Sequence, residues 1–128
     1  MKYIYTGWFI SPEEINGKLA KQIATPHITL TFKPDNAFED KFGAMADIEI
    51  VGYGNDGENE GYLCNVYSYD TFLAEQAKQI KIPHITISVS ANGKPVNTAK
   101  IKFSPIPKFH LIGIYGGFTS KGIVIKKA

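Results

Sequence analysis

A repeated five-residue segment is the feature of this sequence that most constrains its fold. Positions 26–30 read Pro-His-Ile-Thr-Leu, and positions 83–87 read Pro-His-Ile-Thr-Ile. Further along each half an aliphatic residue is followed by glycine, at Val51-Gly52 and at Ile112-Gly113. Internal duplication of one unit explains both coincidences. We therefore expect two similar lobes related by a pseudo-twofold axis, with equivalent strands facing each other.

The length of the chain, 128 residues, is typical of one domain with its own hydrophobic core. We assign residues 1–128 to a single domain in which the two repeats span about 1–67 and 68–128. The extra residues of the second repeat fall in the loop after Ser90, where insertions are tolerated.

Local patterns predict alternating strands and helices. Ser11-Pro12-Glu13-Glu14 has the form of a capping box, and aliphatic residues continue it at helical spacing until Pro26. Asn55-Asp56-Gly57 supplies the backbone angles of a tight hairpin. The expected elements are strands at 3–10, 27–33, 46–53, 61–67 and 84–90, helices from Ser11 to Pro26 and over 68–80, a short strand before Ser104, and a hairpin over 110–126.

Each copy of the repeat places one histidine and one threonine on the same face of a strand. Successive side chains of a strand point to opposite faces, so His27 and Thr29 lie opposite the apolar Ile28. His84 and Thr86 repeat the arrangement. The imidazole and the hydroxyl of one copy are then about 7 Å apart along the strand. With the apolar faces in the core, the polar faces point into the space that the lobes enclose.

This set of side chains fits the cleavage of a phosphodiester. One group must remove a proton from the attacking oxygen and another must protonate the leaving oxygen, and two imidazoles divide these roles near neutral pH. We assign them to His27 and His84. The hydroxyls of Thr29 and Thr86 can donate hydrogen bonds to the non-bridging oxygens, where negative charge develops. The scheme requires no metal and no cofactor.

Two other interpretations of the histidines are weaker. A metal site would need further histidine or carboxylate ligands near each histidine, and the residue two positions on is a hydroxyl in both copies. A single histidine in an alternating strand is usually an ordinary residue of the polar face. Two of the three histidines in equivalent positions of a repeat favour catalysis.

The two Pro-His-Ile-Thr segments resemble the paired His-x-Thr/Ser signature of the two-histidine (2H) phosphoesterase superfamily. The stretch Pro83 to Asn97, with Gly93-Lys94-Pro95-Val96, resembles the cyclic phosphodiesterase modules of fungal and plant tRNA ligases and of RNA-repair-like proteins. The resemblance implies an α+β, bilobal fold: two lobes of antiparallel sheet with helices outside and a central groove. It implies 2′,3′-cyclic phosphates, ADP-ribose cyclic phosphate or 2′-5′-linked oligonucleotides as substrates.

Phage members of this superfamily cleave the cyclic nucleotide signals of bacterial defence, which adds such signals to the expected substrates. The two histidines are 57 positions apart, fewer than is usual in the superfamily, so the loops that shape the substrate pocket are expected to be short.

Five residues are candidates for substrate binding. Lys33 shares the polar face of the first repeat strand with His27 and Thr29 and offers a positive charge to a phosphate. Tyr5, Trp8 and Tyr115 are aromatic side chains that can stack on a base. Ser88 shares the polar face of His84.

Composition limits the expected partners. The net charge of +2 is too small for a protein that binds duplex nucleic acid, while a small nucleotide or oligonucleotide is compatible with it. The chain has no apolar run long enough to span a membrane, and its single cysteine, Cys64, excludes an internal disulfide. We expect a monomer in the cytoplasm, where thiols stay reduced.

Three other signals do not favour a site. The glycine pattern over 52–57 matches a dinucleotide-binding motif only formally, because a strand rather than a helix is expected to follow it. The acidic residues Asp56, Glu58 and Glu60 lack the last ligand of a calcium loop and are expected in a solvated hairpin tip. His110 lies outside the repeated segments, and we expect it to be structural.

The main alternative function is a binding module that holds or sequesters a nucleotide in the same groove without cleaving it. Binding alone would not need two proton-transfer groups, which argues against this alternative. An RNA-binding accessory protein is a third possibility, and the low net charge argues against it.

Overall fold

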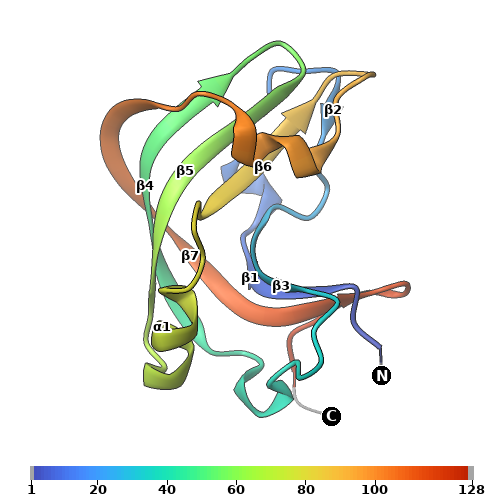
Figure 1. Cartoon of the computed structure of the whole chain (residues 1–128), viewed down its shortest axis with the longest axis vertical. Coiled ribbons are helices and arrows are strands. Elements are labelled where there is room, and N and C mark those ends of the chain that lie inside the picture. Colours follow the sequence, from blue (N-terminus) through green and yellow to red (C-terminus); the bar gives the residue numbers. More distant parts are fainter. Residues whose placement is uncertain (1, 127–128) are drawn as a thin grey trace.

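The computed structural model describes residues 2–126, which form one continuous antiparallel sheet with little helix (Figure 1). One α-helix, α1, is assigned within this range, together with three short 3-10 turns. The strands are β1 (Tyr5–Phe9), β2 (Lys21–Gln22), β3 (His27–Phe32), β4 (Met45–Asn55), β5 (Asn59–Ser68), β6 (His84–Val89), β7 (Ser104–Thr119) and β8 (Gly122–Val124); the helix is α1 (Thr71–Ala77), and the turns are η1 (Pro12–Glu14), η2 (Glu39–Lys41) and η3 (Pro95–Lys100).

The core lies on one face of this sheet. Strand β4 shows why: Ala46, Ile48 and Ile50 alternate with Asp47 and Glu49, and only the apolar set is fully buried. Strands β3 and β6 add their own isoleucines, and α1 covers one end of the core. The largest fully buried apolar side chains are Trp8, Tyr115, Ile28, Ile48, Ile50, Leu73, Ile85 and Ile87.

Apart from β2, the strand order is symmetric about the pair β4-β7. It runs β2-β6-β5-β4-β7-β1-β3, with β8 paired to the end of β7. The two long strands with aliphatic-glycine pairs, β4 and β7, are neighbours, and the two strands with the Pro-His-Ile-Thr segments each lie two places outside them. The two repeats therefore contribute to one sheet. By position the counterpart of β5 in this order is β1.

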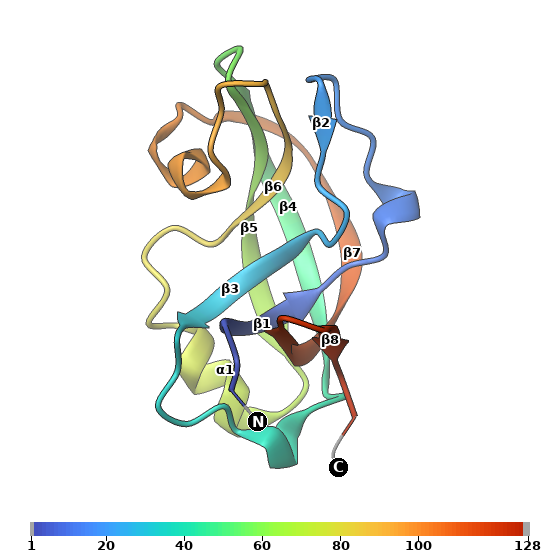
Figure 2. The same cartoon turned by 90° about the vertical axis from the view of Figure 1, so that its right-hand side faces the viewer.

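The sheet curls until β3 and β6 come into contact (Figures 1 and 2). The pairing of β2 with β6, just before β3 in the chain, explains why β3 lies close to β6. Strand β2 pairs with Ser88 and Val89 at the end of β6, and the Ile23 amide donates to the Ile87 carbonyl. The chain enters β3 four residues later, at His27, so β3 is held beside the first half of β6.

Most predicted strands and the second helix are confirmed, with different ends. The hairpin at Asn55-Asp56-Gly57 is present: Gly57 has φ +89, and Asp56 Oδ1 accepts from the amides of Glu58 and Asn59. The second helix begins at Thr71 rather than at position 68, because the Asp70 side chain caps it by accepting from the Leu73 amide.

The predicted helix from Ser11 to Pro26 is wrong. Only η1 forms, and the Ser11 side chain makes no capping hydrogen bond. The segment is extended along β6 instead, where the Leu19 amide donates to Ser88 Oγ and the Gln22 side chain bonds both backbone groups of Gly17. Gly17 costs a helix about 1 kcal/mol, and these tertiary hydrogen bonds favour the extended form.

Two smaller expectations also fail. The short strand before Ser104 is replaced by η3. Glu60 is not in the solvated hairpin tip: it is 1% exposed, its carboxylate accepts from Ser88 Oγ at 2.7 Å and the Lys18 amide at 2.8 Å, and Tyr53 Oη also donates to it. Asp56 and Glu58 are exposed, as expected.

Candidate active site

Contact between β3 and β6 brings the two predicted His-x-Thr pairs to one place. Strand β3 is at one end of the strand order and β6 is second from the other end, so this contact closes the curl of the sheet (Figure 2). Ile28 on β3 and Ile85 on β6 are buried, while His27, Thr29, His84 and Thr86 are half-buried. The predicted alternation of polar and apolar faces is therefore confirmed over the His-Ile-Thr segment of both strands, but not beyond it, because Phe32 is exposed and Ser88 is fully buried.

The two histidines have the same local environment at Nδ1. His27 Nδ1 is 2.9 Å from the Thr25 carbonyl oxygen, and His84 Nδ1 is 2.7 Å from that of Ile82. In each copy the acceptor is the residue before the proline, a position that proline restricts to extended angles. A carbonyl can only accept, so Nδ1 carries the proton of the neutral ring. Nε2 is then the atom that can take up or give a proton.

Aromatic side chains enclose His27. The Tyr5 ring stacks on the imidazole with centroids 4.2 Å apart and planes 20° apart, and the Phe9 ring lies 5.9 Å away. Burial lowers the pKa of His27, and the positive charge of His84 lowers it further, against the opposite effect of the Thr25 carbonyl. His27 is therefore disposed to be neutral and to accept a proton.

The Thr86 hydroxyl belongs to a buried hydrogen-bond network. It donates to Thr98 Oγ1 at 2.8 Å, and the Pro95 carbonyl oxygen lies 3.3 Å away as a second acceptor. Thr98 is fully buried and also accepts from the Asn59 side-chain amide at 2.9 Å. That amide donates to the Lys94 carbonyl as well. This network fixes η3 over the His84 side of the site.

The sequence patterns did not indicate the supporting residues Thr25, Asn59 and Thr98. Thr25 precedes the proline of the first repeat, which is a usable signal, because a carbonyl at that position can reach the histidine two residues on. Asn59 and Thr98 are 39 positions apart and carry no motif, so only the fold brings them together.

The substrate-binding predictions for Trp8 and Tyr115 are wrong. Both side chains are fully buried, and their rings pack 5.5 Å apart in the core, so neither can stack on a base. The Tyr115 hydroxyl donates to the Ala37 carbonyl. Ser88 is also fully buried and is occupied by Glu60 and the Leu19 amide, so the structure excludes it as a contact for substrate.

Lys33 does not join the histidines either. Strand β3 ends at Phe32, and Lys33 follows in the left-handed region with φ +49 and its ammonium 5.5 Å from the Phe32 ring. Six residues of extended chain separate its backbone from His27 by roughly 20 Å. Tyr5 is the one candidate of the five that lies at the site.

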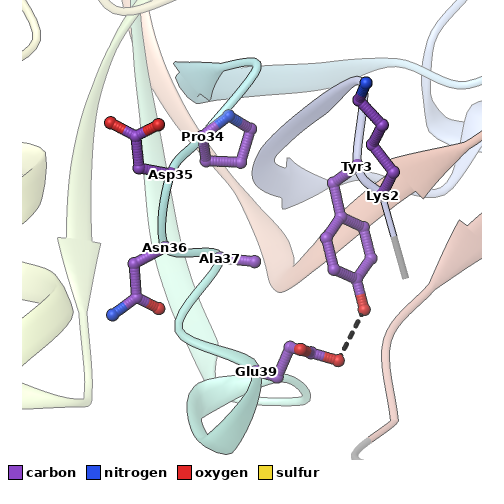
Figure 3. Close-up of a pocket in the computed structure, with 7 residues that line it drawn as sticks. All are labelled: Lys2, Tyr3, Pro34, Asp35, Asn36, Ala37 and Glu39. Atoms are coloured by element: carbon purple, nitrogen blue, oxygen red, sulfur yellow. Dashed lines mark hydrogen bonds between the residues drawn. The ribbon is translucent and has the colours of Figure 1, made fainter.

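The cavities nearest to Lys33 lie at this far end of β3. One of about 470 Å³ is lined by Lys2, Tyr3, Glu39 and the loop 34–37, and the Tyr3 hydroxyl donates to Glu39 across it (Figure 3). A second, of about 440 Å³, includes Lys33. Neither cavity includes His27 or His84 in its lining.

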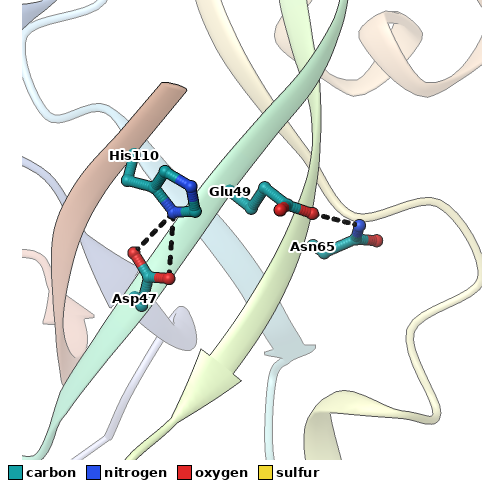
Figure 4. Close-up of polar contacts among 4 residues, drawn as sticks. All are labelled: Asp47, Glu49, Asn65 and His110. Carbon is teal, nitrogen blue, oxygen red and sulfur yellow. Dashed lines mark hydrogen bonds and ion pairs between the residues drawn. The ribbon is translucent and has the colours of Figure 1, made fainter. Parts of the chain in front are cut away.

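His110 contacts a carboxylate away from the two histidines of the repeats. Its Nδ1 lies 3.0 Å from both carboxylate oxygens of Asp47 on the outer face of the sheet, beside a hydrogen bond from Asn65 to Glu49 (Figure 4). Burial raises the pKa of the Cys64 thiol to about 12, which makes it a poor nucleophile. Within residues 2–126, no group of three or more His, Cys, Asp or Glu side chains is arranged to hold a metal ion.

Comparison with known proteins adds no relative: no family model, curated protein or solved structure matches this chain. None of the helices described over residues 2–126 is long and apolar enough to cross a membrane.

Proposed function

We propose that this protein is a metal-independent phosphodiesterase of the two-histidine type. The observation that supports it best is the duplicated imidazole environment: His27 and His84 lie on contacting strands, and each has Nδ1 on the carbonyl two residues before it. Two ordinary surface histidines would have no reason to share the tautomer that leaves Nε2 as the reactive atom. Strand propensity alone explains the threonines but not this match.

In the proposed reaction His27 is the general base and His84 the general acid. His27 Nε2 accepts a proton from the attacking water as its oxygen bonds to phosphorus. The bond from phosphorus to the leaving oxygen then breaks, and His84 Nε2 supplies the proton to that oxygen. The lowered pKa of His27 supports its role as base, because the neutral form is the one that accepts. Thr29 and Thr86 lie two residues on, where their hydroxyls can approach the phosphate.

The substrate we propose is a cyclic or 2′-5′-linked nucleotide phosphodiester: a 2′,3′-cyclic phosphate, ADP-ribose cyclic phosphate or a cyclic oligonucleotide signal. The small net charge supports a small anion over duplex nucleic acid. The symmetric strand order supports a two-lobed 2H arrangement with the site at the lobe boundary. We further propose a cytoplasmic location, supported by the buried free thiol of Cys64.

One observation favours a second candidate, a module that binds the nucleotide without cleaving it. The Thr86 hydroxyl proton is already engaged by Thr98 or Pro95, which leaves one of the four polar groups less free to donate to a phosphate. The duplicated histidine environment favours the enzyme, since sequestration needs no matched pair of reactive nitrogens.

Turnover of a substrate panel in the presence of a chelator decides between these functions. The panel contains 2′,3′-cyclic mononucleotides, ADP-ribose cyclic phosphate, 2′-5′ dinucleotides and cyclic oligonucleotides. The variants are His27→Ala and His84→Ala, with His110→Ala as the matched control because it removes the third histidine. We expect wild type and His110→Ala to cleave one class, and each of the other variants to lose roughly 10²–10⁴-fold in kcat.

Chelator-sensitive turnover would contradict the metal-independent mechanism. Binding of a panel member with no turnover by any variant would establish the sequestering module instead. Equal loss in His110→Ala would show that the effect is not specific to the pair.

A further inference from the structure

Three parallel rings form a column that ends on His27. Tyr5 on β1 lies between His27 on β3 and Phe118 on β7, with centroid distances of 4.2 and 5.2 Å and planes 20° and 12° apart. Tyr5 and Phe118 are direct cross-strand partners, so the sheet register fixes their stack. The His27 imidazole thus packs on the Tyr5 ring, and the Phe118 ring supports Tyr5 from its other side.

The contact between Tyr5 and His27 depends on Gly7. In the register of β1 and β3 the direct partner of His27 is Phe9, four residues beyond Tyr5. Gly7 lies between them on the same face and has no side chain to stand in the way, and the Tyr5 ring reaches within 5.9 Å of the Phe9 ring. Any Cβ on Gly7 would meet the Ile28 carbonyl oxygen at 2.0 Å, so the close approach of β1 to β3 requires glycine here.

Tyr5 and His27 are also in polar contact at Nδ1 of the imidazole. The Thr25 carbonyl accepts from His27 Nδ1, and the Tyr5 hydroxyl oxygen lies 3.2 Å from the same nitrogen. The hydroxyl therefore sits over the proton-bearing nitrogen, on the side away from the reactive Nε2. The ring covers one face of the imidazole and excludes water from it.

We propose that Tyr5 is a positioning residue for His27: its braced ring holds the imidazole in one orientation and shields it from water, which makes His27 the base of the pair. This rests on the proposed phosphodiesterase function and extends it by naming the residue that positions the base. No aromatic ring is stacked on His84 among the described residues. The titratable groups that act on His27 are Tyr5 from β1 and His84 from β6.

Two substitutions separate the effect of the Tyr5 ring from that of its hydroxyl. Tyr5→Phe keeps the stack, whereas Tyr5→Leu removes it; Tyr67→Leu, at an exposed tyrosine on the outer face of β5, is the matched control. The first readout is the His27 pKa from an NMR titration of its ring protons, assigned with His27→Ala. We expect wild type, Tyr5→Phe and Tyr67→Leu to share a lowered pKa, and Tyr5→Leu to move it up toward 6.5.

The second readout is the pH dependence of kcat on the substrate identified by the panel. In Tyr5→Leu the acidic limb is expected to move to higher pH together with the His27 titration, and kcat to fall by roughly ten- to a hundredfold because the imidazole is no longer held in place. Tyr5→Phe is expected to stay within about threefold of wild type, as the ring is retained.

The outcomes distinguish this proposal from the function it rests on. An unchanged His27 titration in folded Tyr5→Leu overturns the positioning role, even if His27→Ala is inactive. A shifted titration without catalysis in wild type supports the Tyr5 contact and rejects the enzyme. If Tyr5→Leu fails to fold, Phe118→Leu removes the brace instead, and a His27 pKa unmoved in that variant counts against the proposal.

Discussion

The two copies of Pro-His-Ile-Thr have the same sequence and different surroundings. In the first copy the histidine is enclosed: Tyr5 stacks on His27 and Phe9 lies beside it. In the second copy the threonine is enclosed: the Thr86 hydroxyl bonds Thr98, which η3 supplies. Over residues 2–126 the Thr29 side chain has no such hydrogen-bond partner.

This difference follows from the positions of the two strands in the sheet. Strand β3 is at the end of the order and is covered by the aromatic side chains of β1, the strand with which it pairs. Strand β6 lies between β5 and β2, and the long loop after it folds back as η3. Identical Pro-His-Ile-Thr segments thus acquire different surroundings from what packs on them, with an enclosed histidine in one copy and a fixed hydroxyl in the other.

The largest expected effect tests whether the copies act as a unit. If His27 and His84 serve one proton-transfer reaction, removing either breaks the same step, so the losses should not multiply. We expect the double variant His27→Ala/His84→Ala to be within about tenfold of the worse single variant in kcat, although each single change costs roughly 10²–10⁴-fold. Losses that multiply would mean that the two copies act independently.

The threonines should separate activity from stability. Thr29→Val removes a hydroxyl without a protein partner, so we expect kcat to fall by roughly 10–10³-fold with the melting temperature unchanged. Thr86→Val removes a hydroxyl that Thr98 already holds, so we expect a smaller loss of kcat and a lower free energy of unfolding. Steady-state kinetics and thermal melts of both variants measure the two effects side by side. The reverse order would show that Thr86, not Thr29, contacts the phosphate.

The sequence predicted the histidine strands well because a period of two decides which side chains share a face. His27 and Thr29 had to separate from Ile28 wherever β3 lay in the fold, and the same holds on β6. The hairpin at Asn55-Asp56-Gly57 was predictable for a similar reason, since its side chains bond their own backbone. Such features depend on local geometry alone.

Features that depend on distant partners were not predictable. The segment after Ser11 has a capping box, yet hydrogen bonds that its backbone amides donate to Glu60 and Ser88 hold it extended against β6. Trp8 and Tyr115 are aromatic, as residues that stack on bases are, and only the fold shows that they fill the core together. Sequence spacing alone could not choose between a buried and an exposed face for either.

The network behind Thr86 predicts a stability effect confined to the second copy. Thr98→Val removes the shared acceptor, leaving the Asn59 amide with the Lys94 carbonyl alone. We expect a loss of about 1–3 kcal/mol in the free energy of unfolding by urea denaturation, because a buried polar group loses a partner. Thr31→Val, at an exposed position of β3, is the matched control and should be near neutral. Equal stability of the two variants would show that the network does not hold η3.

The smallest expected effect is the pH dependence of stability that the enclosure of His27 imposes. Because its pKa is lowered in the folded state, the unfolded chain binds a proton more readily below about pH 6.5. Stability should therefore fall as the pH drops through 6.5 toward the folded pKa, and level out below it. The lowered pKa values of Asp56 and Asp70 affect stability in a separate, lower pH window, since their stabilisation is lost only below their ordinary value of 3.8.

Urea titrations of His27→Gln at a series of pH values test this prediction. The free energy of unfolding should no longer fall with pH in the upper window, and its change in the lower window should be the same as in wild type. An unaltered upper window in His27→Gln would mean that the first copy is no more enclosed than the second, and the contrast between them would then rest on the threonines alone.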